Sequence, residues 1–407
     1  MNKKKALSAV KHHINMLCND ITERCVGSEG NRKATLYFKN ELIKSGWETE
    51  ETLLEVMDWN TQGASLICDQ SSFEVFSSPY SLGCSVQAEL VEISSLNELK
   101  KENLNEKIAL LHGEIAKEQI MPKNFVFYNP ETHQHIIKIL EDSGVKAIIC
   151  ATGRNAALAG GVYPFPMFED GDFDIPSVYM KDVEGERLLN YIGKTIRLDS
   201  FAVRIPETAY NVIGRKYGKR KDRIVITAHI DAKKDTPGAI DNGTGVAILM
   251  LLSEMLSHFD SNYTIELLAF NGEDYYAVSG QMKYIEQNKH QFDDVLLNIN
   301  IDGAGYKQGL SSFSAFGLPD NIMAAWQLIL QKHTNIIEGL PWYQGDHSIF
   351  IQHGRPAIAV SSDWFIRHMD NQDITHTPKD NIDIVNFDRL VEIAIAIKDL
   401  IITINNQ

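Results

Sequence analysis

The chain has 407 residues, of which 54 are acidic and 39 are basic, so its formal net charge is −15. This charge argues against nucleic acid or an anionic membrane as a main partner, because both would repel an acidic surface. The apolar content of 44% and the charged content of 23% are typical of a soluble globular protein. A chain of 407 residues is longer than one compact core usually holds, so we expect two domains.

Three lysines stand at positions 3–5, like the basic start of a signal peptide, but no uninterrupted apolar stretch follows them. Apolar residues instead recur at helical spacing, which predicts an amphipathic first helix, at Ala6, Val10, Ile14 and Leu17. No apolar run approaches the length of a transmembrane span. The five cysteines include no CxxC pair and fit a reducing compartment. We therefore predict a cytoplasmic protein, with secretion as the alternative, and leave its oligomeric state open.

The first half of the chain predicts one helix followed by strands and turns. Residues 32–45 have helical periodicity and are closed by Gly46. Short alternating segments separated by Ser, Gly and Asn then predict strands at 73–76, 86–93 and 107–111. A helix near 133–143 is followed by predicted strands at 145–150 and 175–180.

The second half alternates regularly between strands and helices. Strands are predicted at 223–228, 264–270, 295–301 and 357–361, and helices at 246–258, 280–288, 321–333 and 387–402. This alternation predicts an α/β fold with a mainly parallel sheet and helices on both faces. The simplest architecture is one α/β domain formed by residues 1–58 and 207–407, with a β-rich domain inserted at 59–206.

Acidic and histidine residues follow successive predicted strands of the second half. Because sites in open α/β sheets form beyond the carboxyl ends of the strands, we expect these side chains to converge on one cleft. The set comprises His229, Asp241, Glu273, Asp274, Asp302 and His376.

Two histidines and three carboxylates are sufficient to hold two divalent metal ions. Two Zn²⁺ ions carry four positive charges, and three aspartates with one hydroxide balance them, which favours ionisation of a bound water near neutral pH. Co²⁺ or Mn²⁺ are possible alternatives to zinc. Glu273 lies outside this ligand set and is suited to act as the general base. Asp231 is expected to accept the second ring N–H of His229 and fix its tautomer, and Asp380 could do the same for His376.

These residues stand in segments that resemble the M28 zinc aminopeptidases. The resembling segments are 24–28, 229–231, 238–245, 271–274, 300–302, 345–347 and 376–380. The resemblance implies a phosphorylase/peptidase-like mixed sheet and two zinc ions. It implies that His229 and Asp302 bind one ion, that Asp274 and His376 bind the other, and that Asp241 bridges them, with Glu273 as general base. It also implies a cis peptide bond between Asp241 and Asn242.

The inserted segment resembles a protease-associated (PA) domain in the strand patterns at 106–111, 144–149 and 175–178. Two positions depart from the M28 pattern. Asp274 stands where Glu is usual, and Thr375 stands where an oxyanion-stabilising Tyr commonly precedes the last His. The group that replaces this Tyr is left open. We expect the substrate pocket to include Tyr343, Asp346 and His347.

We therefore predict a di-zinc aminopeptidase that hydrolyses N-terminal residues of peptides. Its expected partners are peptides with a free N-terminus, and neither nucleic acid nor a membrane. One alternative is a carboxypeptidase or glutaminyl cyclase on the same scaffold, and another is a non-catalytic, receptor-like binding protein. No GxSxG, P-loop or GxGxxG motif is present, which argues against serine hydrolases and nucleotide-binding proteins.

Overall fold

A computed structural model of the protein describes residues 1–407 except 126–128, 154–162 and 370. The chain divides into two compact units. Unit 1 comprises Met1–Val56 and Thr208–Gln407, and unit 2 comprises Met57–Glu207. The sequence predicts these boundaries between residues 58 and 59 and between residues 206 and 207. Two long strands, β1 (Glu48–Cys68) and β8 (Thr195–Lys216), each contribute residues to both units.

Unit 1 contains a mixed sheet in the order β13-β12-β14-β11-β9-β10-β8. Its central strands, which are all parallel, are β14 (Ala357–Ser362), β11 (Val295–Ile301), β9 (Arg223–His229) and β10 (Thr264–Phe270). Strand β8 is antiparallel to β10, β12 (Ser311–Phe316) is antiparallel to β14, and β13 (Ile336–Glu338) is parallel to β12. Every residue of β9 and β10 is buried, as expected for strands covered on both faces. The predicted mixed, mainly parallel sheet is confirmed.

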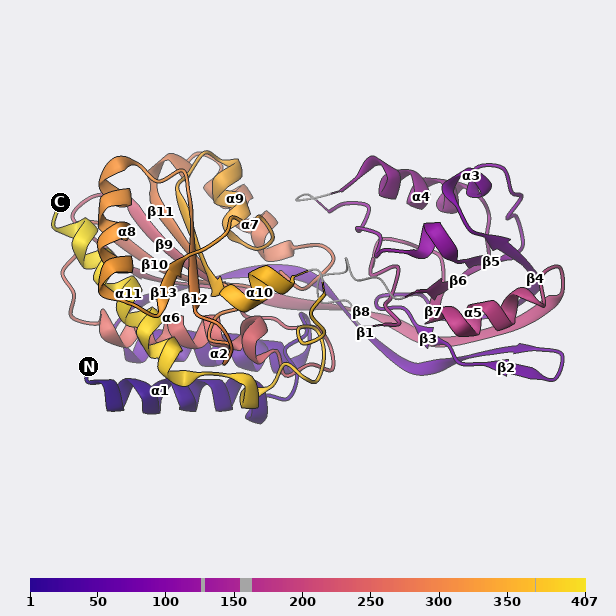
Figure 1. Ribbon diagram of the computed structural model, residues 1–407, viewed down its shortest axis with the longest axis horizontal. Coiled ribbons are helices and arrows are strands. Elements are labelled where there is room, and N and C mark those ends of the chain that lie inside the picture. The colour runs from indigo at the N-terminus through magenta and orange to yellow at the C-terminus, as the bar shows by residue number, and fades with distance from the viewer. Residues whose placement is uncertain (126–128, 154–162, 370) are drawn as a thin grey trace. The chain divides into compact units, whose positions relative to one another are not determined.

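Helices cover both faces of this sheet (Figure 1). One face carries α1 (Lys3–Asn15), α2 (Glu29–Lys44), α6 (Thr244–Met255) and α11 (Phe387–Asn405), with α8 (Asp320–Lys332) against α11. The other face carries α7 (Ser279–Asn288) and α9 (His347–Gln352), whose Tyr284 and Phe350 rings lie 5.7 Å apart. The remaining helical segments are α10 (Asp363–His368), η1 (Met16–Asp20), η3 (Ala239–Gly243), η4 (Phe292–Asp294) and η5 (Ile382–Ile384).

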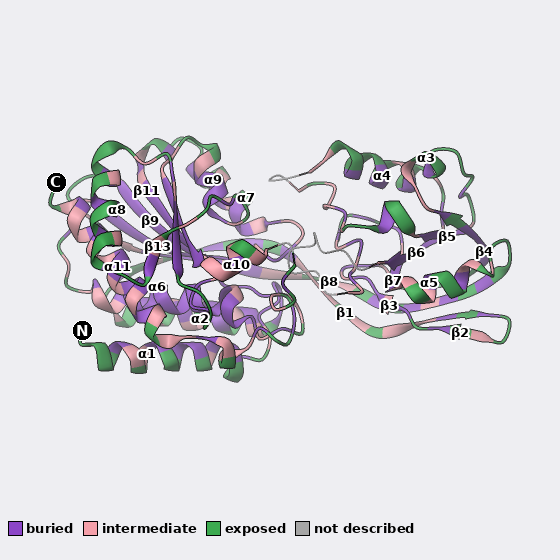
Figure 2. Ribbon diagram, in the orientation of Figure 1, coloured by how far each residue is buried: buried purple, intermediate pink, exposed green. Residues whose placement is uncertain are grey.

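Helix α6 is the centre of the unit 1 core. Residues 244–253 are all buried, and the helix contacts strands β9 and β10 as well as α1, α2 and α11 (Figure 2). Helix α1 is amphipathic as predicted, since Ala6, Val10 and Ile14 are buried while its other face is exposed. This core fixes the loop that precedes α6, which carries one of the candidate site residues.

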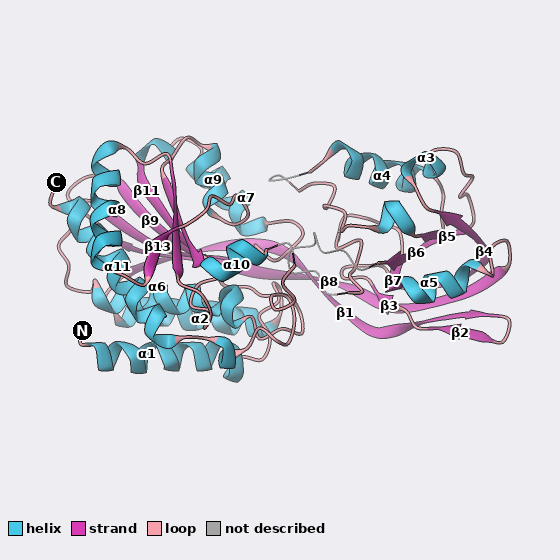
Figure 3. Cartoon of the chain, in the orientation of Figure 1, coloured by secondary structure: helices cyan, strands magenta, loops and turns pink. Residues whose placement is uncertain are grey.

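The strands of unit 2 follow the order β8-β4-β5-β6-β7-β3. Strands β4 (Cys84–Ile93), β5 (Ile108–Leu111), β6 (Ala147–Thr152) and β7 (Ser177–Lys181) pair in parallel, and β3 (Phe76–Ser77) is antiparallel to β7. Unit 2 also contains the helical segments α3 (Leu96–Leu99), η2 (Gly113–Ala116), α4 (Glu131–Asp142) and α5 (Asp182–Leu189). It therefore combines helices with its strands (Figure 3). Its resemblance to a PA domain stays a prediction.

One predicted strand of unit 2 is wrong. Residues 73–76 do not form a single strand, because Phe73 ends β2 (Ser71–Phe73) and pairs with Leu66 of β1, while Phe76 begins β3 and pairs with Tyr179 of β7. The two phenylalanines belong to different strand pairs, and the local sequence carries no sign of which partner each takes.

Among the described residues, no helix is both long and apolar enough to cross a membrane. The cytoplasmic location expected from the sequence stays a prediction.

The position of α6 predicts a large loss of stability when its side chains are shortened. Leu251 is fully buried in α6, so Leu251→Ala should lower the free energy of unfolding by about 2–5 kcal/mol. The matched control is Leu328→Ala on α8, whose side chain is 55% exposed and whose loss should stay within about 0.5 kcal/mol. Urea unfolding followed by tryptophan fluorescence measures both. Equal losses for the two variants would contradict the central role of α6.

Candidate metal centre

Three adjacent parallel strands deliver candidate residues to one edge of the unit 1 sheet. His229 is the last residue of β9, Asp302 directly follows β11, and Glu273 and Asp274 lie in the turn after β10. In the sheet β9 lies between β10 and β11, and His229 pairs with Phe270, the last residue of β10. Since parallel strands end at the same edge, these side chains lie close together.

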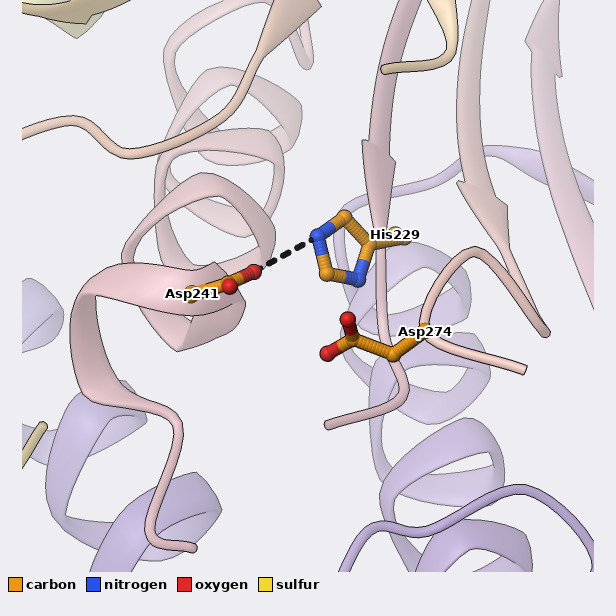
Figure 4. A group of neighbouring side chains, drawn as sticks. All are labelled: His229, Asp241 and Asp274. Atoms are coloured by element: carbon orange, nitrogen blue, oxygen red, sulfur yellow. Dashed lines mark ion pairs between the residues drawn. The ribbon is translucent and has the colours of Figure 1, made fainter. Parts of the chain in front are cut away.

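Asp241 lies in η3, between β9 and α6, and the peptide bond that follows it is cis, as predicted. Its two carboxylate oxygens face two different imidazoles. Oδ1 lies 3.0 Å from His229 Nε2, and Oδ2 lies 3.1 Å from His376 Nε2. Figure 4 shows Asp241 and Asp274 turned toward His229.

The remaining ligand candidates complete two groups that share Asp241. His376 Nε2 lies 3.1 Å from Asp274 Oδ1, and His229 Nε2 lies 3.6 Å from Asp302 Oδ1. One ligand atom each from His229, Asp241 and Asp274 lie within 4.8 Å of one another. The structure therefore brings together all five residues that the sequence selected as metal ligands.

The charges of this cluster shift the pKa values of its members. Burial lowers the pKa of His229, but the interaction with the surrounding carboxylates outweighs it, so the pKa is raised well above its usual value. Burial opposes ionisation of Asp241, yet the two histidines hold its pKa well below the usual range. Burial raises the pKa of Asp302 and of Glu273, and the nearby carboxylates Asp274 and Asp302 raise that of Glu273 further.

The donor set fits divalent metal ions. His229 Nε2 and Asp274 Oδ2 are buried without a hydrogen-bond partner among the described residues, although buried polar atoms normally have one. Imidazole nitrogens and carboxylate oxygens are ligands that zinc takes in proteins. A cation would satisfy both atoms and offset the repulsion among the carboxylates.

Asp231 has a different role from the one predicted. The His229 ring places Nδ1 3.2 Å from the main-chain oxygen of Asp231, whereas the carboxylate lies 3.7 Å away, beyond a hydrogen bond. The carboxylate instead accepts hydrogen bonds from the main-chain N–H groups of Gly272, Glu273 and Asp274, at 2.8, 3.2 and 3.0 Å. Asp231 therefore fixes His229 through its backbone and the 272–274 turn through its side chain.

Asp380 also differs from its prediction. Its carboxylate accepts from the main-chain N–H groups of Ile240, at 2.7 Å, and Asp241, at 3.0 Å. Its own carbonyl accepts from the N–H of Ala239 at 3.1 Å. Asp380 therefore holds the turn that carries Asp241, and it does not orient the ring of His376.

The three predicted pocket residues lie in different surroundings. The Tyr343 side chain is 62% exposed and packs against Phe316. Asp346 is buried and accepts from the Gln281 side chain at 2.6 Å, and burial raises its pKa to about 7. His347 is fully buried, with Nε2 2.8 Å from the carbonyl of Trp342, and burial lowers its pKa to about 4. The structure therefore gives Asp346 and His347 internal partners, and only Tyr343 presents its side chain to solvent.

Thr375, which stands before His376, is held within its own loop. The Gln372 side chain accepts the Thr375 N–H at 3.0 Å and donates to the Thr375 hydroxyl. Sequence reasoning gave no role to Gln372 or to Gln281. Gln281 lies 65 residues from its partner Asp346, so no local spacing could have revealed that contact.

The chain is similar to known peptidases. Residues 211–401 match peptidase family M28. Aminopeptidase YwaD of Bacillus subtilis is 25% identical over 279 residues, which are 64% of this chain and 57% of that protein. The chain thus aligns with just over half the length of this relative.

Solved structures that share the fold include two aminopeptidases. The aminopeptidase from Aneurinibacillus sp. strain AM-1 superposes with a TM-score of 0.74 at 20% identity, covering 98% of this chain and 92% of that one. The zinc aminopeptidase BSAP from Bacillus subtilis superposes with a TM-score of 0.72 at 19% identity, covering 97% and 93%. The residues that match peptidase family M28, 211–401, supply all five clustered ligand candidates.

Proposed function

We propose that this protein is an aminopeptidase that uses two zinc ions to remove N-terminal residues from peptides. The observation that carries the proposal is the position of Asp241, whose two carboxylate oxygens each face a different histidine at about the same distance. A carboxylate so placed is suited to bridge two ions. The zinc aminopeptidase among the structural relatives and the aminopeptidase among the sequence relatives support the same assignment.

In this proposal the ligands fall into two sets. His229 and Asp302 hold one ion, Asp274 and His376 hold the other, and Asp241 contributes one oxygen to each. Zinc ions bound there would lower the pKa of a water molecule and polarise the carbonyl of the scissile peptide bond.

Glu273 is the proposed general base. It follows β10 next to the ligand Asp274, and its N–H is fixed by Asp231. The raised pKa of Glu273 makes its carboxylate a stronger base. It is therefore suited to take a proton from the attacking water and to return it to the leaving nitrogen. The shorter side chain of Asp274, compared with the usual Glu, still places an oxygen 3.1 Å from His376.

Glu273 is also a candidate partner for the amine of the substrate. Asp274 and Asp302 are ligands in this proposal, whereas Glu273 is not, so its carboxyl group is free to accept a hydrogen bond from a substrate ammonium group. A free N-terminus is therefore the expected feature of the substrate.

The direct test is hydrolysis of a panel of aminoacyl-p-nitroanilides with a free or an acetylated amine. Activity should require the free amine, disappear with chelator, and return when zinc is added back, with Co²⁺ and Mn²⁺ tested in parallel. Activity on the acetylated compounds, or on peptides trimmed from the C-terminus, would instead indicate a different peptidase. Cyclisation of N-terminal glutamine would indicate a cyclase.

Glu273→Gln should lower kcat by a factor of about 10² to 10⁴, because the amide cannot take the proton. Zinc content should stay unchanged, since Glu273 is not a ligand in this proposal. The matched control is Glu286→Gln on α7, whose side chain is 70% exposed and which should keep normal turnover. Turnover of Glu273→Gln within a few-fold of the parent would rule out this role.

Zinc should also raise the melting temperature of the metal-depleted protein. A ligand at about 100 times its Kd stabilises the folded state by about 2.7 kcal/mol. Asp241→Asn should weaken this effect strongly, because it removes the charge shared by the two sets. Calorimetry of both proteins with and without zinc measures the difference, and an unchanged melting temperature in the parent protein would contradict metal binding.

A further inference from the structure

A buried arginine far from the candidate ligands in sequence contacts the segments that carry two of them. Arg24 lies between η1 and α2, and it is 2% exposed. Its guanidinium donates to four main-chain carbonyls. They belong to Leu17, at 2.6 Å, Ile230, at 3.1 Å, Pro237, at 2.8 Å, and Gly238, at 2.7 Å.

Three of these carbonyls lie next to candidate ligands. Ile230 directly follows His229. Pro237 and Gly238 are the last two residues before η3, which contains Asp241. The Gly238 carbonyl also accepts the N–H of Gly243 and so closes the η3 turn. One guanidinium therefore joins the end of β9 to the start of the Asp241 turn. The two side chains carried by these segments meet at 3.0 Å.

Burial of the Arg24 guanidinium costs free energy that its hydrogen bonds must offset. A guanidinium stays charged in proteins, and burying a charge is unfavourable unless it is fully hydrogen-bonded. Among the described residues, no carboxylate lies within ion-pair distance of Arg24. Main-chain carbonyls are its principal partners, the Cys18 sulfur lies 3.9 Å from the guanidinium, and the Asp380 carboxylate interacts with it over a longer distance. A planar fork that contacts several carbonyls fixes their spacing, and neither an apolar side chain nor lysine offers that fork.

We propose that Arg24 is a positioning residue of the metal centre, which sets the distance between His229 and Asp241 through their backbones. The inference rests on the proposed function, because it assumes that both residues bind zinc. Arg24 touches neither metal nor substrate in this account, and it acts only through the two loops.

The test compares zinc affinity among variants, measured by competition with a chromophoric chelator on the full-length protein. Arg24→Lys should lower zinc affinity by about 10- to 100-fold, as loss of groups that orient ligands commonly does. The matched control is Arg223→Lys. Arg223 is also buried, at the opposite end of β9, where it donates to Glu266 and Asn288. This control should lower the melting temperature while leaving zinc affinity within about two-fold of the parent.

Arg24→Gln provides the second variant if the lysine variant does not fold, because it buries no charge and still offers an amide donor. It should also lose zinc affinity, since one amide cannot join both loops. Zinc affinity equal to that of the parent in either folded Arg24 variant would overturn the proposal and leave Arg24 as a purely structural residue. Absence of zinc binding in the parent protein would instead overturn the proposed function.

Discussion

The concentration of negative charge at one edge of the unit 1 sheet is the constraint on which the rest of the site depends. Strands β9, β10 and β11 end side by side and place Asp274, Asp302 and Glu273 near one another, with Asp241 supplied by the adjoining turn. Like charges at such separations repel, and burial raises the cost of ionising each. Two imidazoles offset part of this charge, and divalent cations would offset the remainder. The repulsion among these carboxylates would therefore favour the binding of divalent metal ions at this edge of the sheet.

The loops that carry this charge are fastened to one another by polar groups that do not belong to the ligand set. Asp231, after β9, holds the 272–274 turn after β10. Asp380, four residues beyond His376, holds the turn of Asp241. Arg24 holds both the end of β9 and the start of that turn. Each segment is therefore fixed by a side chain from another segment, so the site is preorganised by long-range contacts rather than by any one loop.

The sequence predicted the parts of this structure that depend on periodicity and strand ends. Strands β9, β10 and β11 are short and mainly apolar, so their carboxyl ends, and with them His229, Asp274 and Asp302, could be located. Strand β12 was missed because Ser311–Phe316 is rich in serine and its strand form depends on pairing with β14. The contacts of Asp231, Asp380 and Arg24 join segments up to 214 residues apart, and no local pattern encodes them.

The most direct test of this account is a crystal structure of the zinc-loaded protein with anomalous diffraction recorded across the zinc edge. The account predicts two strong anomalous peaks, one between His229 and Asp302 and one between Asp274 and His376, with the Asp241 carboxylate between them. A single peak, or peaks bound by other residues, would contradict the two-ion site.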